Sequence, residues 1–213
     1  MKPHTIVFAL VLCTTQARSA DHLEPAAETV AGYESGVIEV LKDAFTDDVQ
    51  VRAIVEPSFE KEFAVGTKES DGVFRIYFVR ASQQVWSNLL NKEPTKNIGS
   101  EICEMEIPAD LGRRIDLVWD GMLRQTRPNE SPTYGLDGDN YYFSKDVDGK
   151  LAIGEMWSPP DDSKPGKLVD IVYTMRDLCT KKDEALATKL NEQVDDLLAR
   201  LALPPSDLSG VKR

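Results

Sequence analysis

The segment Asn140-Tyr-Tyr-Phe-Ser-Lys-Asp-Val-Asp-Gly-Lys-Leu-Ala-Ile-Gly-Glu-Met-Trp157 decides the fold class. Two β-like runs, 141–143 and 151–157, flank Asp146-Val-Asp-Gly149, and Asp-Gly is a strong signal for a tight hairpin turn. The segment therefore predicts a β-hairpin, which requires an antiparallel sheet.

Hydrophobic periodicity on both sides of this hairpin predicts the remaining elements. They are a helix over about 34–46, a strand over 49–55, a polar irregular stretch over 58–72 that closes with the turn Ser70-Asp-Gly72, a central strand over 73–79, a short helix over 82–91, a strand around Cys103, a helix from Pro108 to about 125, and two final helices over about 166–179 and 184–202. This order predicts an α+β fold: one domain over 21–213, with a mainly antiparallel sheet packed by about five helices and a C-terminal helical pair. The tail from about residue 204 is expected to fray.

The first 20 residues resemble a secretory signal peptide. Lys2 precedes a short apolar core over 6–13, and small or polar residues follow up to Ala20. Cleavage there would remove Lys2 and Arg18 but no acidic residue, which changes the formal net charge from −11 to −13. The sequence therefore predicts an exported protein of the periplasm or the extracellular space. It contains no apolar run of the length that a transmembrane helix needs.

Two cysteines, Cys103 and Cys179, remain after such a cleavage. Each lies on the apolar side of its element, because Cys103 alternates with Glu104 on a strand and Cys179 ends the apolar stripe of a helix. An oxidising compartment favours one disulfide between them, and two separate buried thiols are the alternative.

Several chemistries are excluded by residue counts. His22 is the one imidazole of the mature chain, and its place near the new N-terminus predicts a mobile side chain. A nucleophile that relies on histidine, or a zinc site built from His and Cys, is therefore not expected. The acidic balance argues against a nucleic-acid partner. No catalytic residue and no cofactor are predicted.

The hairpin turn partly matches a calcium-binding loop. Read from Ser144, the segment places Asp146, Asp148 and Glu155 at ligand positions, but the first ligand is missing and the flanks are β-like rather than helical. A plain hairpin is favoured, and calcium is kept as an alternative. Asp137, Asp139 and Glu155 offer a second alternative, a pair of carboxylates that acts as acid and base on a glycan.

The three tryptophans are assigned different roles. Trp86 and Trp119 lie on or near apolar helix faces, so both are predicted to be core residues. Trp157 stands at a strand end before Ser158-Pro159, where an aromatic ring is available to a partner, and a core position is the alternative. The hairpin brings the loop over 135–139 to the same end, so the predicted binding residues are Asp137, Asp139 and Trp157.

The leading functional hypothesis is a non-enzymatic extracytoplasmic binding protein. Its acidic surface would attract a basic protein partner, as in an immunity or inhibitor protein that neutralises a basic toxin or a cell-wall hydrolase. The alternatives are a carboxylate-based enzyme, with or without calcium, that acts on an envelope glycan, and a structural or assembly factor of the envelope.

Overall fold

A computed structural model of the chain describes residues 21–26, 33–129, 137–147 and 150–201. The proposed signal peptide over 1–20, Asp148 and the tail from 204 lie outside the described residues, as do residues 135 and 136 of the loop next to Trp157. In the part described, no helix combines the length and the apolar character needed to cross a membrane.

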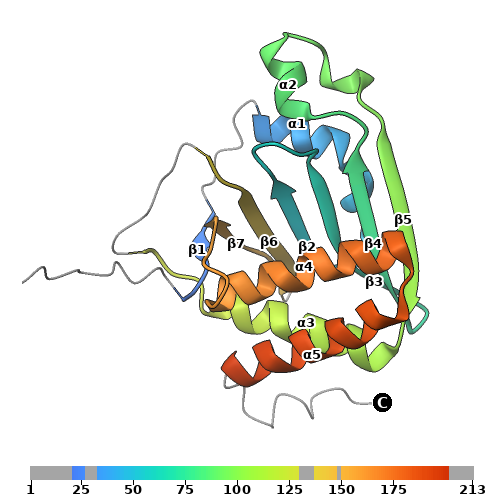
Figure 1. Ribbon diagram of the computed structural model, residues 1–213, viewed down its shortest axis with the longest axis vertical. Coiled ribbons are helices and arrows are strands. Elements are labelled where there is room, and N and C mark those ends of the chain that lie inside the picture. The colour runs from blue at the N-terminus through green and yellow to red at the C-terminus, as the bar shows by residue number, and fades with distance from the viewer. Residues whose placement is uncertain (1–20, 27–32, 130–136, 148–149, 202–213) are drawn as a thin grey trace, which may run out of the picture.

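The fold is α+β, as predicted, and it is built on one antiparallel sheet (Figure 1). The strand order is β1-β7-β6-β2-β3-β4-β5. The strands are β1 (Glu24–Pro25), β2 (Val49–Glu56), β3 (Phe63–Ser70), β4 (Val73–Ala81), β5 (Ser100–Ile107), β6 (Asn140–Val147) and β7 (Lys150–Trp157). The α-helices are α1 (Tyr33–Val40), α2 (Val85–Leu90), α3 (Ala109–Arg124), α4 (Lys164–Lys181) and α5 (Glu184–Leu201), and short 3-10 turns occupy Lys42–Ala44 and Thr95–Asn97.

The predicted hairpin is present as β6 and β7, which pair from Asn140 opposite Trp157 to Val147 opposite Lys150. The prediction of an irregular stretch over 58–72 was wrong, because β3 occupies most of it and pairs with both β2 and β4. Gly66 and the polar residues at the end of β3 hide the alternation in the sequence. The turn that closes it was correct: Asp71 and Gly72 both adopt positive φ angles, 53° and 77°, as a tight hairpin turn requires.

The sheet buries apolar side chains on both faces. Helices α3, α4 and α5 cover one face, which we call the helix face, and α1 and α2 lie on the opposite face (Figure 1). Strand β4 serves both cores: Ile76 and Phe78 pack toward the helix face, whereas Tyr77 and Val79 pack toward α1. This double burial explains why 73–79 is apolar at nearly every position.

One disulfide joins Cys103 of the edge strand β5 to Cys179 near the end of α4, with the Cα atoms 6.1 Å apart. The bridge closes a separation of 76 residues. The prediction of this pairing is confirmed, and its consequence is that the C-terminal end of α4 is fixed against the β4–β5 side of the sheet.

The residues next to the proposed cleavage point belong to the folded body. Leu23 is fully buried, and the carboxylate of Asp21 accepts a hydrogen bond of 2.7 Å from the backbone N–H of Lys164 at the start of α4. His22 is 7% exposed, and its ring contacts the carbonyl oxygen of Leu23 at 2.9 Å. The expectation of a mobile His22 was therefore wrong, because burial of Leu23 and the contact of Asp21 with α4 hold this segment on both sides.

Candidate functional site

The candidate site lies at one end of the sheet, where β2 and β4 end and β3 and β6 begin. Antiparallel pairing brings three connecting segments together at this end: 57–62, 82–84 and 137–139. We call these three segments, with Trp157, the rim. Loops on a rigid sheet are the usual place for binding residues.

Asp139 is the centre of the hydrogen-bond network that orders the rim. Its carboxylate accepts from the backbone N–H of Ser58 at 3.1 Å and from the hydroxyl of Tyr141 at 3.2 Å. Its backbone N–H donates to the hydroxyl of Ser158 at 2.9 Å, and its carbonyl oxygen accepts from the N–H of Ser158 at 2.9 Å. The carboxylate of Asp139 thus holds two chain segments in place, and Asp137 beside it is fully on the surface.

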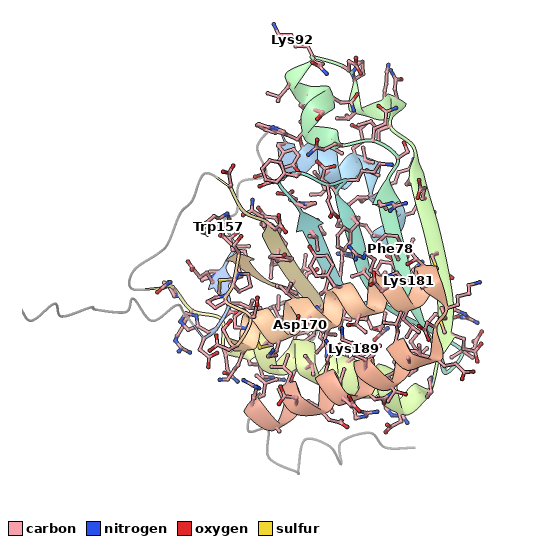
Figure 2. All side chains as sticks on the ribbon, viewed as in Figure 1. Phe78, Lys92, Trp157, Asp170, Lys181 and Lys189 are labelled. Atoms are coloured by element: carbon pink, nitrogen blue, oxygen red, sulfur yellow. A yellow bond between two sulfur atoms is a disulfide. The ribbon has the colours of Figure 1, made fainter. Side chains whose placement is uncertain are left out.

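Trp157 is the last residue of β7 and lies next to the segment that Asp139 orders (Figure 2). Its side chain is half-buried. Gly138 packs directly on its ring, since a Cβ atom added at Gly138 would come within 2.5 Å of two ring carbons. The structure therefore places the 137–139 segment beside Trp157, which is the juxtaposition that the hairpin register predicts.

Phe59 is a rim residue that was not singled out from the sequence. Its side chain is 83% exposed, the largest value among the exposed large hydrophobic residues of the described chain. It directly follows Ser58, whose hydroxyl donates to the carbonyl oxygen of Gly138 and accepts from the N–H of Gly138 at 3.0 Å. An aromatic ring held in water by an ordered backbone is typical of a binding surface. An isolated Phe directly after Pro57-Ser58 in a polar stretch was the available signal.

Trp86 is also exposed, at 46%, so its assignment to the core was wrong, whereas Trp119 is fully buried as predicted. The reason is local: α2 is only 6 residues long and buries Val85 and Asn88, which turns Trp86 outward. The ring of Trp86 meets the ring of Tyr33 edge to face, with centroids 5.3 Å apart.

Glu62, a fully buried carboxylate at the end of the 57–62 segment, accepts hydrogen bonds from residues of both α1 and α2. It accepts from the backbone N–H groups of Val85 and Trp86 at 2.8 and 3.1 Å and from the hydroxyl of Tyr33 at 2.8 Å. Loss of solvation and the neighbouring Glu62 raise the pKa of the Tyr33 hydroxyl well above its ordinary range. These three bonds satisfy the buried carboxylate and cap the start of α2.

Glu56 is the most perturbed carboxyl among the described residues with a resolved shift. It is 5% exposed, and burial, together with repulsion from Glu34, Glu62 and Glu155, raises its pKa to about 8. Glu56 and Glu155 lie on the face opposite the helix face, since the register places both in line with Tyr142 and Asn140 of β6. Glu56 was not singled out from the sequence, because its burial depends on α1.

The carboxylates considered from the sequence are not gathered into one group. Asp139 bonds Tyr141 on the helix face, whereas Glu155 lies on the other face. Asp146 pairs with Leu151 at the far end of the hairpin, about 13 Å along the strand from Glu155. In the part of the chain that the structure describes, no cluster of three His, Cys, Asp or Glu residues is arranged to hold a metal ion.

Comparisons of the chain with protein-family models, with curated proteins and with solved structures find no match.

Proposed function

We propose that the protein is a non-enzymatic, extracytoplasmic binding protein whose rim takes a basic protein partner, in the manner of an immunity or inhibitor protein. The observation that carries the proposal is Phe59, which is 83% exposed on a turn fixed by Ser58. A fixed, exposed aromatic residue loses little conformational entropy on binding, and residues of this kind dominate the energy of protein interfaces.

The charge of the rim supports a basic partner. Asp137 is exposed beside Trp157, and Glu60 is exposed directly after Phe59. The whole chain carries a formal net charge of −11, so its field attracts a positively charged partner before contact.

Export is supported by the amino-terminal pattern and by the disulfide between Cys103 and Cys179. Because Asp21 and Leu23 are part of the folded body, cleavage is expected between Ala17 and Asp21, which gives a mature N-terminus between Arg18 and Asp21. Mass spectrometry of the protein collected from its native envelope or medium tests this. Recovery of an intact Met1 would contradict export.

The partner is tested by affinity capture from the native envelope and secretome at low and high salt. A basic protein should be captured at low salt and lost at high salt, and Phe59→Ala should weaken its binding by about 2 kcal/mol. The matched control is Leu151→Ala, which removes a 58% exposed side chain from β7 at the opposite end of the sheet from the rim. Equal binding by wild type and Phe59→Ala, or capture of acidic proteins only, would contradict the proposal.

Glu56 supports a second candidate function, carboxylate-based cleavage of an envelope glycan. A carboxyl with a pKa of about 8 is protonated at neutral pH and able to act as a general acid, and Glu155 is a carboxylate on the same face of the sheet. Incubation of the purified protein with peptidoglycan, with and without calcium, tests this. Release of reducing ends that Glu56→Gln abolishes would favour the enzyme over the binding protein.

A further inference from the structure

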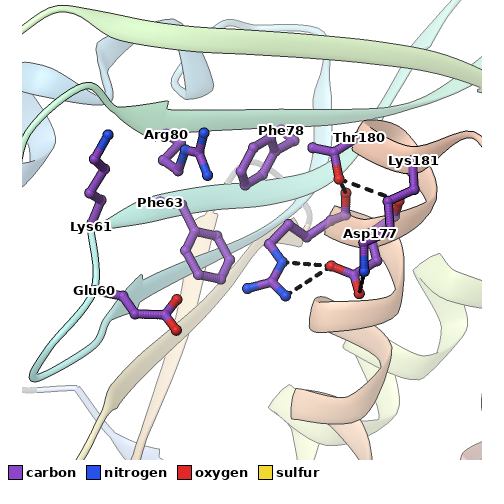
Figure 3. A pocket seen from close by; sticks show the side chains of 9 residues that line it. Glu60, Lys61, Phe63, Phe78, Arg80, Asp177, Thr180 and Lys181 are labelled. Atoms are coloured by element: carbon purple, nitrogen blue, oxygen red, sulfur yellow. Dashed lines mark hydrogen bonds and ion pairs between the residues drawn. The ribbon is translucent and has the colours of Figure 1, made fainter.

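A cleft of about 480 Å³ lies on the helix face, between β3, β4 and the C-terminal end of α4 (Figure 3). Its floor is aromatic: Phe63 and Phe78 are each 2% exposed, and their ring centroids are 5.7 Å apart. Figure 2 shows Phe78 and Lys181 close to one another on the β4 side, far from Trp157. The volume is within the range of small-ligand sites, and a largely apolar floor is typical of them.

Arg176 of α4 forms one wall, and contacts with two aromatic rings and with Asp177 hold its guanidinium group. It stacks over the ring of Tyr173 at 4.6 Å and approaches that of Phe63 at 5.7 Å. Its Nε and one terminal nitrogen reach the same carboxylate oxygen of Asp177, at 2.9 and 2.8 Å. Two of its five N–H donors are used in this way, and the remaining three have no acceptor among the described residues. An arginine oriented like this is prepared to bind a second carboxylate.

Arg80 of β4 forms the opposite wall and is incompletely satisfied. It pairs with Glu101 of β5 at the edge of the cleft, while its Nε is buried and finds no hydrogen-bond partner in the described part of the chain. Lys61 also lines the cleft and makes no ion pair with any described residue. Buried donors without a partner are uncommon in folded proteins and point to a missing acceptor.

The net charge of the residues around the cleft is opposite in sign to the net charge of the whole chain. Four cations line it, from Lys61, Arg80, Arg176 and Lys181. The lining acids Glu60 and Asp177, and Glu101 at the edge, leave one positive charge in excess, although the chain as a whole has a formal net charge of −11. One excess charge suits a monoanion rather than a phosphate dianion.

We propose that this cleft binds a small organic carboxylate with a flat apolar body, whose ring lies on Phe63 and Phe78 and whose carboxylate meets Arg176 and Lys61. The cleft shares Glu60 and Lys61 with the 57–62 segment of the rim, but Phe59 and Trp157 are not among the residues that line it. It requires neither a protein partner nor catalysis.

The probe is 2-naphthoate, and its neutral isostere 2-naphthamide is the control ligand. Titration calorimetry of the oxidised protein should show saturable binding of one naphthoate, weaker at high salt, and naphthamide should bind about tenfold more weakly or worse. Arg176→Gln should lower the naphthoate affinity by about tenfold and leave the weak naphthamide affinity unchanged. Arg113→Gln, which removes the same charge from the exposed side of α3, should change neither affinity.

Lys61→Gln keeps the test decisive if Arg176→Gln does not fold, because Lys61 makes no ion pair with any described residue. This variant should also weaken naphthoate more than naphthamide. Equal affinity for the two probes, an unchanged naphthoate affinity in the folded charge variants, or no saturable binding at about 1 mM ligand would overturn the proposal.

Discussion

Ser58 and Gly138 are 80 residues apart in sequence and share two hydrogen bonds through one hydroxyl group. The hydroxyl of Ser58 donates to the carbonyl oxygen of Gly138 and accepts from its N–H. Because Gly138 also lies on the ring of Trp157, this one side chain connects the turn that carries Phe59 to the segment that covers Trp157. The exposed and the half-buried aromatic residues of the rim are thus parts of one ordered structure.

Replacement of Ser58 by Ala should lower the free energy of unfolding by about 1–2 kcal/mol, because it leaves the N–H and carbonyl of Gly138 without their partner. Urea denaturation measures this change. Ser70→Ala is the control, since Ser70 is exposed at the turn between β3 and β4, and it should change stability by no more than about 0.5 kcal/mol. Equal effects of the two substitutions would show that the Ser58–Gly138 bonds contribute nothing to stability.

Phe59 and Trp157 should respond differently to truncation even without a partner. Phe59→Ala removes a ring that is 83% exposed, so its effect on the free energy of unfolding should stay within about 0.5 kcal/mol. Trp157→Ala removes the ring on which Gly138 packs and should cost about 2 kcal/mol. Thermal denaturation of both variants distinguishes the two roles. A large loss of stability in Phe59→Ala would mean that Phe59 is structural and would remove the main support for the binding surface.

Most of the fold could be predicted from periodicity, and the exception is instructive. Strand β4 is apolar on both faces, and the β6–β7 hairpin carries its own turn, so both are recognisable locally. Strand β3 is not, because Gly66 occupies a position where a Cβ atom would lie 1.9 Å from the carbonyl oxygen of Val51. The residue that looks like a strand breaker in the sequence is required by the close approach of β2, which only the folded structure shows.

The site could be predicted only where register determines it. The turn of the hairpin places the 137–139 segment beside Trp157, and this follows from counting residues along two strands. Phe59 and Glu56 were not singled out and Trp86 was assigned wrongly, since the exposure or burial of these side chains depends on tertiary packing that local periodicity does not determine.

The disulfide should contribute about 4 kcal/mol to the free energy of unfolding, because it closes a loop of 76 residues in the unfolded chain. The double variant Cys103→Ser, Cys179→Ser should lose this amount in guanidinium denaturation. Wild type treated with a reductant should lose a similar amount, whereas the double variant should not respond to the reductant. A reductant effect of the same size on both proteins would contradict the assignment.

The raised pKa of Glu56 predicts that the free energy of unfolding falls as the pH rises from about 4.5 to about 8. The ordinary pKa of a glutamate carboxyl is 4.5, and burial with repulsion from Glu34, Glu62 and Glu155 raises the pKa of Glu56 in the folded protein to about 8. Between these values the folded chain keeps a proton that the unfolded chain releases, so raising the pH favours unfolding. The stabilising contribution of the protonated group is fully present below pH 4.5 and is lost as the pH rises through 8.

Glu56→Gln imitates the protonated carboxyl and should remove this part of the pH dependence. At pH 4 the variant and wild type should have similar stability, and above pH 8 the variant should be more stable by several kcal/mol, on the order of 4. Denaturant titrations of both proteins across pH 4–9 measure this difference. Glu93→Gln, which neutralises an exposed carboxylate after α2, should follow the wild-type curve. Parallel curves for wild type and Glu56→Gln over the whole range would show that Glu56 is ionised in the folded protein, and the support for its role as a general acid would be lost with it.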